Sequence, residues 1–158
     1  MKARVCWVLA GVVALSGISL AQSAAKKDAG PGFGKEKLIG AWHLVSIGES
    51  GADGQSPAAE IKGTLIYTRD GHMSVQLMYP PSASTLTNDY VLNGYEASFG
   101  SCDVDEAAHT VTHHVQGSIT RGLVGKNLTR VYQFSDDRHL VIKSADPAEH
   151  WQVVWEHY

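Results

Sequence analysis

The chain has 158 residues, which fits one domain at about 100–200 residues per domain and leaves no room for several. Its 44% hydrophobic and 18% charged residues are ordinary for a chain that buries a core, which excludes wholesale disorder. Thirteen basic and sixteen acidic residues give a formal net charge of −3, whereas proteins that bind nucleic acid or anionic lipid usually carry a basic excess, so no nucleic-acid partner is expected.

Residues 1–21 have the pattern of a secretory signal peptide. Lys2 and Arg4 precede an apolar stretch at residues 5–18, and small residues follow up to Ala21. The apolar stretch is too short to span a membrane comfortably. We predict cleavage near Ala21, a periplasmic or extracellular location, and no stable membrane anchor afterwards; an uncleaved anchor is the alternative.

The chain after the signal divides into a linker and a domain. Residues 22–36 are rich in Gly, Ala and Lys and predict a flexible linker, and residues 37–158 form the expected domain. Cleavage removes Cys6 and leaves Cys102 alone, so no intramolecular disulfide is expected in the exported protein. The alternating apolar run around Cys102 favours a buried, inert thiol over a reactive one.

From Leu38 onward, apolar residues recur with a period of two, which predicts short β-strands. The alternation is clearest at Met73, Val75 and Leu77, which are separated by polar residues. We expect eight strands, at residues 41–47, 63–68, 72–78, 99–104, 109–117, 126–134, 139–144 and 151–156.

The connections between these strands are mostly short and polar. Residues 69–71 end in the Asp-Gly pair that is typical of a β-hairpin. Two connections are long, at residues 48–62 and 80–98, and loops of this length usually act as lids or plugs. Apolar spacing in the second, from Tyr90 onward, predicts one short amphipathic helix between Pro81 and Phe99.

Eight sequential antiparallel strands favour an all-β fold, an eight-stranded antiparallel up-and-down barrel. Closure into a barrel removes both exposed sheet edges. The interior of such a barrel is just wide enough for side chains or for one small ligand. A two-sheet sandwich is the alternative, but its crossovers need more long connections than this chain has.

Three blocks of sequence resemble the lipocalin-like domain proteins of bacteria and fungi. They are LIGAWHLVS at residues 38–46, GTLIYTRDGHMSVQLM at residues 63–78 and VTHHVQGS at residues 111–118. The resemblance implies a calycin-type barrel able to carry a small apolar molecule, and it implies no common ligand or reaction. His43 departs from the family, whose members tend to have a long basic residue after the Trp. We interpret Trp42 as a structural plug of the barrel, with Gly40 letting another backbone approach.

The more apolar face of each strand is expected to point into the barrel. The lumen is then apolar, with four polar groups among its side chains. The candidate ligand-binding residues are Tyr67, Val75, Leu77, His113, Arg130, Tyr132 and Trp155. A buried guanidinium needs an anion nearby. For Arg130 this anion is either an internal partner in a purely structural pair, with Asp103 on the fourth strand as one candidate, or the carboxylate of a bound ligand.

Recognisable metal and cofactor motifs are missing from the sequence. The chain has eight histidines, but no Cys-x-x-Cys or His-Glu-x-x-His pattern. His109 and His113 would lie about 13 Å apart along an extended strand, too far to share an ion. The Gly-x-Ser-x-Gly motif and the phosphate-binding loop are also absent. We therefore expect neither a metal nor a cofactor.

Three functions remain open at this point. The first is a secreted or periplasmic barrel that binds a small hydrophobic molecule, with or without a carboxylate. The second is a cofactor-free isomerase or cyclase, with His113 and Tyr67 or Tyr132 as its acid–base pair. The third is a filled barrel that acts through its outer loops. The apolar lumen and the lid-length connections favour the binding protein over an enzyme, while the oligomeric state is not predicted.

Overall fold

A computed structural model describes residues 34–49, 56–57 and 60–158, so the expected signal peptide and most of the expected linker lie outside the described residues. The described chain begins with a one-turn helix, α1 (Lys35–Leu38), which includes the last two residues assigned to the linker. The strands are β1 (Gly40–Glu49), β2 (Ser56–Pro57), β3 (Lys62–Tyr67), β4 (His72–Met78), β5 (Tyr95–Asp105), β6 (Thr110–Ser118), β7 (Asn127–Phe134), β8 (His139–Ser144) and β9 (Trp151–His157). Within the described ranges, no helix is both long and apolar enough to cross a membrane.

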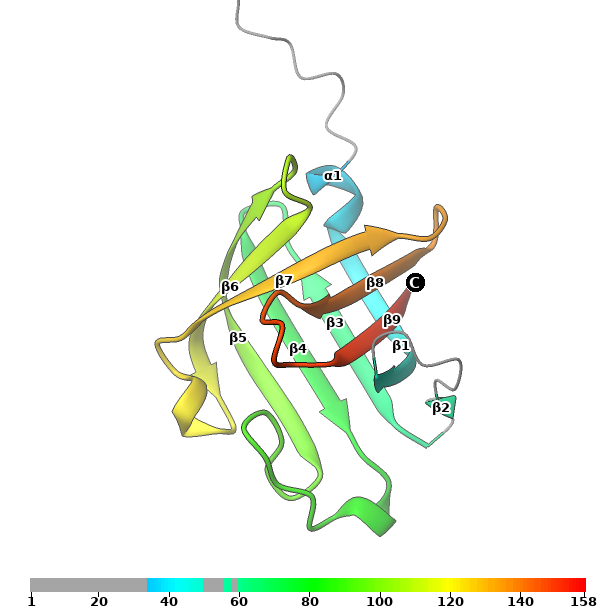
Figure 1. The fold of residues 1–158 in the computed structure, drawn as a ribbon, viewed down its shortest axis with the longest axis vertical. Helices are drawn as coiled ribbons and strands as arrows, with labels where there is room; N and C mark the ends of the chain where they lie inside the picture. The colour runs from blue at the N-terminus through cyan, green and yellow to red at the C-terminus, as the bar shows by residue number, and fades with distance from the viewer. Residues whose placement is uncertain (1–33, 50–55, 58–59) are drawn as a thin grey trace, which may run out of the picture. The chain divides into compact units, whose positions relative to one another are not determined.

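The strands form one closed antiparallel barrel (Figure 1). From β3 to β9 each strand pairs with its neighbour in the sequence, β1 pairs with β3, and β1 also pairs with β9 to complete the ring. The two-residue β2 adds only a short pairing with β1. The prediction of an eight-stranded antiparallel up-and-down barrel is confirmed, and the sandwich alternative is wrong.

The inward and outward faces follow the alternation in the sequence. In β4, Met73, Val75 and Leu77 are buried while the residues between them are exposed or partly exposed. In β6, His113 is buried and its neighbour His114 lies on the outer face. Successive side chains of a strand point to opposite sides, so burying one face fixes the whole register.

The long connection between β4 and β5 differs from the sequence prediction. Its short helix is a 3-10 turn, η1 (Pro81–Ala83), and no helix forms from Tyr90 to Phe99. Backbone geometry explains the difference, because Asn93 and Gly94 have positive φ angles of 52° and 77°, which interrupt a right-handed helix. β5 then begins at Tyr95, four residues earlier than expected. A second 3-10 turn, η2 (Arg121–Leu123), lies between β6 and β7.

One end of the barrel is filled by Trp42 and covered by α1. Trp42 is 1% exposed, and its indole Nε1 donates a hydrogen bond of 2.9 Å to the carbonyl of Leu38 in α1. The ring of His157 meets the indole edge-on with centroids 4.7 Å apart. Gly40 accommodates that imidazole rather than the backbone expected from the sequence, since a Cβ there would overlap the His157 ring.

Polar contacts tie α1 to three hairpin turns at this end. The backbone N–H of Lys35 donates to Glu106, and the Lys37 ammonium pairs with Asp137 at 2.9 Å. Glu36 pairs with Arg69 at 3.0 Å. The turns after β3, β5 and β7 therefore all contact α1. The β4–β5 connection lies at the opposite end (Figure 1).

Candidate functional site

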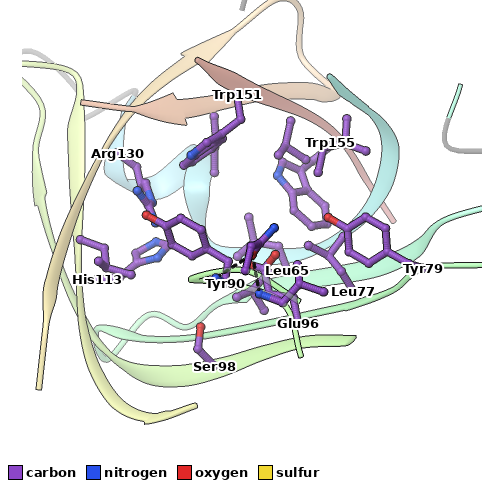
Figure 2. Close-up of a pocket in the computed structure, with 17 residues that line it drawn as sticks. Leu65, Leu77, Tyr79, Tyr90, Glu96, Ser98, His113, Arg130, Trp151 and Trp155 are labelled. Atoms are coloured by element: carbon purple, nitrogen blue, oxygen red, sulfur yellow. Dashed lines mark hydrogen bonds between the residues drawn. The ribbon is translucent and has the colours of Figure 1, made fainter. Parts of the chain in front are cut away.

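A cavity of about 180 Å³ lies in the lumen (Figure 2), next to the β4–β5 connection, which is at the end of the barrel away from α1 (Figure 1). Its walls come from the end of β4, the beginning of β5, the beginning of β9 and the strands between them. Most of the seventeen lining side chains are apolar or aromatic. Asn88, Tyr90 and Val91 of the β4–β5 connection also line it, so this connection forms part of the cavity wall, in the position expected of a lid.

Five of the seven candidate residues line the cavity together. Val75 and Leu77 come from β4, His113 from β6, Arg130 from β7 and Trp155 from β9. These strands are far apart in the sequence, and barrel closure brings them to one space. Whether the five residues bind a ligand remains a prediction.

The other two candidates, both tyrosines, lie inside the barrel but not on the cavity wall. Tyr67 is 3% exposed and is hydrogen-bonded through its hydroxyl to Nε2 of His113 at 2.7 Å. Tyr132 lies nearer the α1 end, where its ring packs edge-on against His109 and Phe134. Alternation predicted the correct face for both residues, but it does not predict their depth along the lumen.

Arg130 lies against two aromatic rings and an acidic partner that the sequence analysis did not identify. Its side chain is 8% exposed, and the guanidinium carbon lies 4.6 Å from the ring centroid of Trp151 and 5.2 Å from that of Tyr90. Nη1 is 3.6 Å from Oε2 of Glu149, in the β8–β9 connection. The charge of Arg130 is thus paired within the protein, and two aromatic rings lie beside its guanidinium.

Asp103 is not the partner of Arg130, so that part of the sequence analysis is wrong. Asp103 is strongly exposed, and its carboxylate lies 2.8 Å from Nε2 of His114 on the outer surface. In the register of β5 with β6, Asp103 lies opposite Thr112, one residue away from the inward-facing His113. The strand pleat therefore directs Asp103 out of the barrel.

Glu149 connects Arg130 with both aromatic residues that lie against it. The Tyr90 hydroxyl donates to Oε1 of Glu149 at 2.7 Å, and the Trp151 indole N–H donates to Oε2 at 3.0 Å. Partial burial raises the pKa of Glu149, but hydrogen bonds from Ser144, Tyr90 and Trp151, with the charge of Arg130, outweigh it and leave the pKa below its ordinary value. We call Tyr90, Arg130, Glu149 and Trp151 the mouth cluster. It joins the β4–β5 connection to β7 and β9.

The His113–Tyr67 pair is suited to a structural role rather than to proton transfer. Burial, and then the charges of Arg130 and His114, lower the pKa of His113 to about 3, so the imidazole is neutral and a weak base. Burial raises the pKa of Tyr67, which keeps its hydroxyl protonated. Groups poised for acid–base catalysis have pKa values near the working pH, and neither of these does.

Glu96 is a lining residue that the sequence analysis missed. It lies on β5 opposite Leu77 of β4, on the same inward face as Ser98. The structure as described contains neither a hydrogen bond nor an ion pair of its carboxyl group. Burial raises the pKa of Glu96 to about 7, and the charge of Arg130 only partly opposes this. Alternation would have placed Glu96 outward, because the more apolar residues Tyr95, Ala97 and Phe99 alternate with it, yet Tyr95 and Phe99 are 50% and 57% exposed.

The raised pKa of Glu96 predicts a stability that falls as the pH rises. The folded protein holds this proton up to about pH 7, whereas an ordinary Glu loses it near 4.5. Between these values the folded state binds more protons than the unfolded state, so the free energy of unfolding decreases with increasing pH. We expect Glu96→Gln to be about 3 kcal/mol more stable than the parent at about pH 8 and nearly equal at about pH 4.5. Thermal unfolding across this range, with the exposed Glu60→Gln as control, measures the difference; equal curves for the parent and Glu96→Gln would contradict it.

The remaining titratable groups do not assemble into a metal site in the part of the chain that is described. There, no group of three or more His, Cys, Asp or Glu side chains is placed to hold a metal ion. Cys102 is partly buried and unpaired with another cysteine in the described ranges. Burial, with the nearby charge of Asp103, raises the pKa of its thiol, which favours the unreactive protonated form.

A closed barrel of eight antiparallel strands in sequence order, with a cavity in one half, defines a calycin-type barrel. The chain matches the lipocalin-like domain family over residues 39–157 and belongs to that family. A comparison with curated protein sequences gives no match.

Solved structures with a similar fold include a biogenic amine-binding protein, with 19% identity and a TM-score of 0.46. That match covers 78% of this chain and 66% of the other, so this chain spans less than two thirds of that protein. Two variants of the fluorescent protein UnaG match with 14% and 12% identity and TM-scores of 0.39 and 0.40. These matches cover 78% of this chain and 98% and 97% of the UnaG chains. At such identities the likeness concerns the fold alone.

Proposed function

We propose that this protein is an exported barrel that binds a small hydrophobic molecule in the cavity described above. The observation that supports this most directly is the uneven filling of the lumen. Trp42 and its neighbours fill the α1 end, while about 180 Å³ remains open at the other end beside Trp151 and Trp155. A mostly apolar cavity with a few convergent polar groups is the usual form of a small-molecule site.

The size of the cavity limits the ligand. A cavity of roughly 150 Å³ lined by aliphatic and aromatic side chains is known to accept benzene. The cavity here is slightly larger and has a partly polar wall. We therefore propose a ligand with one aromatic ring, or an aliphatic group of similar volume, carrying a short polar end.

A carboxylate on the ligand, one of the possibilities from the sequence, would have to compete for Arg130. Glu149 already supplies the opposing charge, and Tyr90 and Trp151 cover the guanidinium. A carboxylate ligand therefore gains less from Arg130 than it would from an unpaired cation. This possibility is tested with Arg130→Met in the Discussion.

The two other functions have weaker support. A fully filled barrel would leave no cavity at the Trp151 end. An isomerase or cyclase acting through His113 would need an imidazole that accepts a proton near neutral pH, whereas its pKa is lowered to about 3. Tyr132, the other expected acid–base residue, does not line the cavity.

Export is part of the proposal and rests on residues 1–21 alone. The basic start, the apolar stretch and the small residues before Gln22 support cleavage near Ala21. Determining the N-terminal residue of the protein recovered from its own host tests this. A mature chain that begins at Met1 would contradict export by cleavage.

Filling the cavity should abolish binding without unfolding the barrel. Ser98 lies on its wall and is 8% exposed, so Ser98→Leu places additional carbon atoms in the open space. We expect at least a tenfold loss of affinity for 2-phenylethanol by isothermal titration, because overlap with a ligand costs more than about 1.4 kcal/mol. Native mass spectrometry should also show loss of any small molecule that co-purifies with the parent.

Ser101→Leu is the matched control for this change. Ser101 lies on the same strand opposite the outward-facing His114 and does not line the cavity. Its affinity for 2-phenylethanol should equal that of the parent. Equal loss in both variants, or no loss in Ser98→Leu, would contradict binding inside the barrel.

A further inference from the structure

Two opposite walls of the cavity have complementary chemistry. In the ring of eight strands, β5 and β9 are separated by three strands in either direction, so they face each other across the lumen. β5 contributes Glu96 and Ser98, and β9 contributes Trp151 and Trp155 (Figure 2). A small molecule between these walls would have a carboxyl group on one side and indole rings on the other.

The charges that line the cavity do not cancel when Glu96 is ionised. Arg130 is the one guanidinium or ammonium group among the described lining residues, and Glu149 lies within 3.6 Å of it. Glu96 has no such partner within the described ranges, although Arg130 is close enough to affect it electrostatically. An ionised carboxylate in an apolar cavity is unfavourable unless a cation or several hydrogen-bond donors accompany it.

We infer that Glu96 anchors a protonated amine, so that the ligand is a small molecule with a primary or secondary ammonium group on an aromatic or aliphatic body. This inference rests on the proposed function and names its ligand class. The ammonium supplies the missing cation and donates hydrogen bonds to Glu96. The body of the ligand lies against the apolar and aromatic side of the cavity, where indole rings also favour a nearby cation.

An unpartnered carboxyl group has no evident role in holding this barrel together. Within the described part of the chain it forms no hydrogen bond that would stabilise β5, and its burial favours the neutral form. Perturbed acids in clefts are candidates for functional sites for this reason. Ligand ammonium binding would offset the unfavourable burial, because it allows the carboxyl group to ionise next to a cation.

The inference predicts a distinctive pH dependence. Below about pH 7 the carboxyl group of free Glu96 is protonated and must release its proton before it pairs with an ammonium. Amine affinity should therefore fall roughly 30-fold between about pH 8 and about pH 5.5, while a primary amine stays protonated throughout.

The other groups around the cavity do not reproduce this dependence. His113 stays neutral, since its pKa is about 3, and the pKa of Glu149 lies below its ordinary value. Burial raises the pKa of Tyr79 to about 12 and also raises that of Tyr90, so both hydroxyls keep their protons. Arg130 remains a cation as all arginines do. Leucine, isoleucine, valine, tryptophan, serine and asparagine make up the rest of the wall.

Three probes of matched shape test the inference with the intact domain. They are 2-phenylethylamine, the neutral 2-phenylethanol and the anionic 3-phenylpropionate, each titrated calorimetrically at about pH 8 and about pH 5.5. We expect the amine to bind at least tenfold more tightly than the alcohol at the higher pH. The acid should bind most weakly, because it adds a second anion to the cavity.

Variants at Glu96 test whether this residue causes the preference for the amine and its pH dependence. Glu96→Gln should bind the amine at least tenfold more weakly at about pH 8, lose the pH dependence and keep its affinity for the alcohol. Glu60→Gln, an exposed position outside the cavity, should behave as the parent. Glu96→Asp, which keeps the charge, should retain a preference for the amine and shows whether the carboxylate itself is required.

The outcomes distinguish this inference from the proposed function. Equal binding of amine and alcohol, or an amine preference that survives Glu96→Gln, overturns the role of Glu96. Either result remains consistent with binding of a small molecule inside the barrel. Tightest binding of the acid overturns it in favour of Arg130. Failure of all three probes to bind overturns the proposed function and the inference together.

Discussion

Replacing Trp42 by alanine should lower the free energy of unfolding by about 3–5 kcal/mol, the range for removing a large aromatic side chain from a core. Trp42 is 1% exposed and fills the α1 end of the barrel between Phe134 and His157. The substitution also removes the hydrogen bond from the indole to the carbonyl of Leu38 in α1. Urea denaturation at equilibrium measures the loss.

Two control variants distinguish the loss of Trp42 packing from a nonspecific effect of substitutions in β1. Trp42→Phe keeps an aromatic ring but loses the N–H donor, so we expect a smaller loss of about 1–2 kcal/mol. Val45→Ala changes a residue on the outer side of the same strand that is 37% exposed, and its effect should stay within about 0.5 kcal/mol.

Substitution of Trp42 should not affect binding in the ligand cavity. It lies in the other half of the lumen, and Trp42 is not among its lining residues. Folded Trp42→Phe should therefore bind 2-phenylethanol as tightly as the parent. A loss of stability below about 1 kcal/mol in Trp42→Ala would show that the α1 end is not a packed plug.

The fold could be predicted from local patterns because hairpins and alternation act over short distances. Asp70-Gly71 supplies a tight turn, and Gly71 has the positive φ of 82° that such turns require. The buried face of β4 follows directly from Met73, Val75 and Leu77. Once each neighbouring pair is antiparallel and both edges need protection, closure is the simplest arrangement.

The site was predicted less completely, because alternation gives the side of a strand but not the height along the barrel. Tyr132 and Arg130 share the inward face of β7, yet only Arg130 reaches the cavity. Height depends on the tilt and stagger of the strands, which no local pattern records. Glu149 was missed for a related reason, since it lies in a connection where no periodicity specifies its direction.

Glu96 was missed because it violates the pattern used to find inward residues. A charged residue at an inward position resembles the end of a strand, so β5 was predicted to begin at Phe99. Positions that break a local rule in an otherwise consistent sequence are expected at functional or strained sites. The break at Glu96 is thus itself a reason to test this residue.

Replacing Arg130 by methionine should lower the free energy of unfolding by about 2–3 kcal/mol, somewhat less than the range for breaking a fully buried ion pair. The guanidinium loses its contacts with the rings of Tyr90 and Trp151, and Glu149 loses its cation. Glu149 is 31% exposed, so water compensates part of the loss. Arg138→Met, which breaks an exposed pair with Glu156, should change stability by no more than about 1 kcal/mol.

A double-mutant cycle tests whether the ion pair with Glu149 accounts for the loss of stability in Arg130→Met. Glu149→Gln removes the acidic partner while keeping a side chain of similar size. If the pair stabilises the mouth cluster, the combined change with Arg130→Met should be smaller than the sum of the two single losses by about 1 kcal/mol or more. Strict additivity would show that the two aromatic rings, rather than Glu149, hold Arg130.

Binding by Arg130→Met also decides which charged group faces the ligand. With Arg130 occupied by Glu149, the affinity for 3-phenylpropionate should remain near that of the parent, and the affinity for 2-phenylethylamine should not fall, because a repelling cation has been removed. If a ligand carboxylate were held by Arg130, the acid would instead bind about 10–150-fold more weakly, as expected for a charged hydrogen bond worth about 1.5–3 kcal/mol. Loss of stability with unchanged binding of the acid would thus assign Arg130 a structural role in the mouth cluster. Glu96 would then be the charged group available to a ligand.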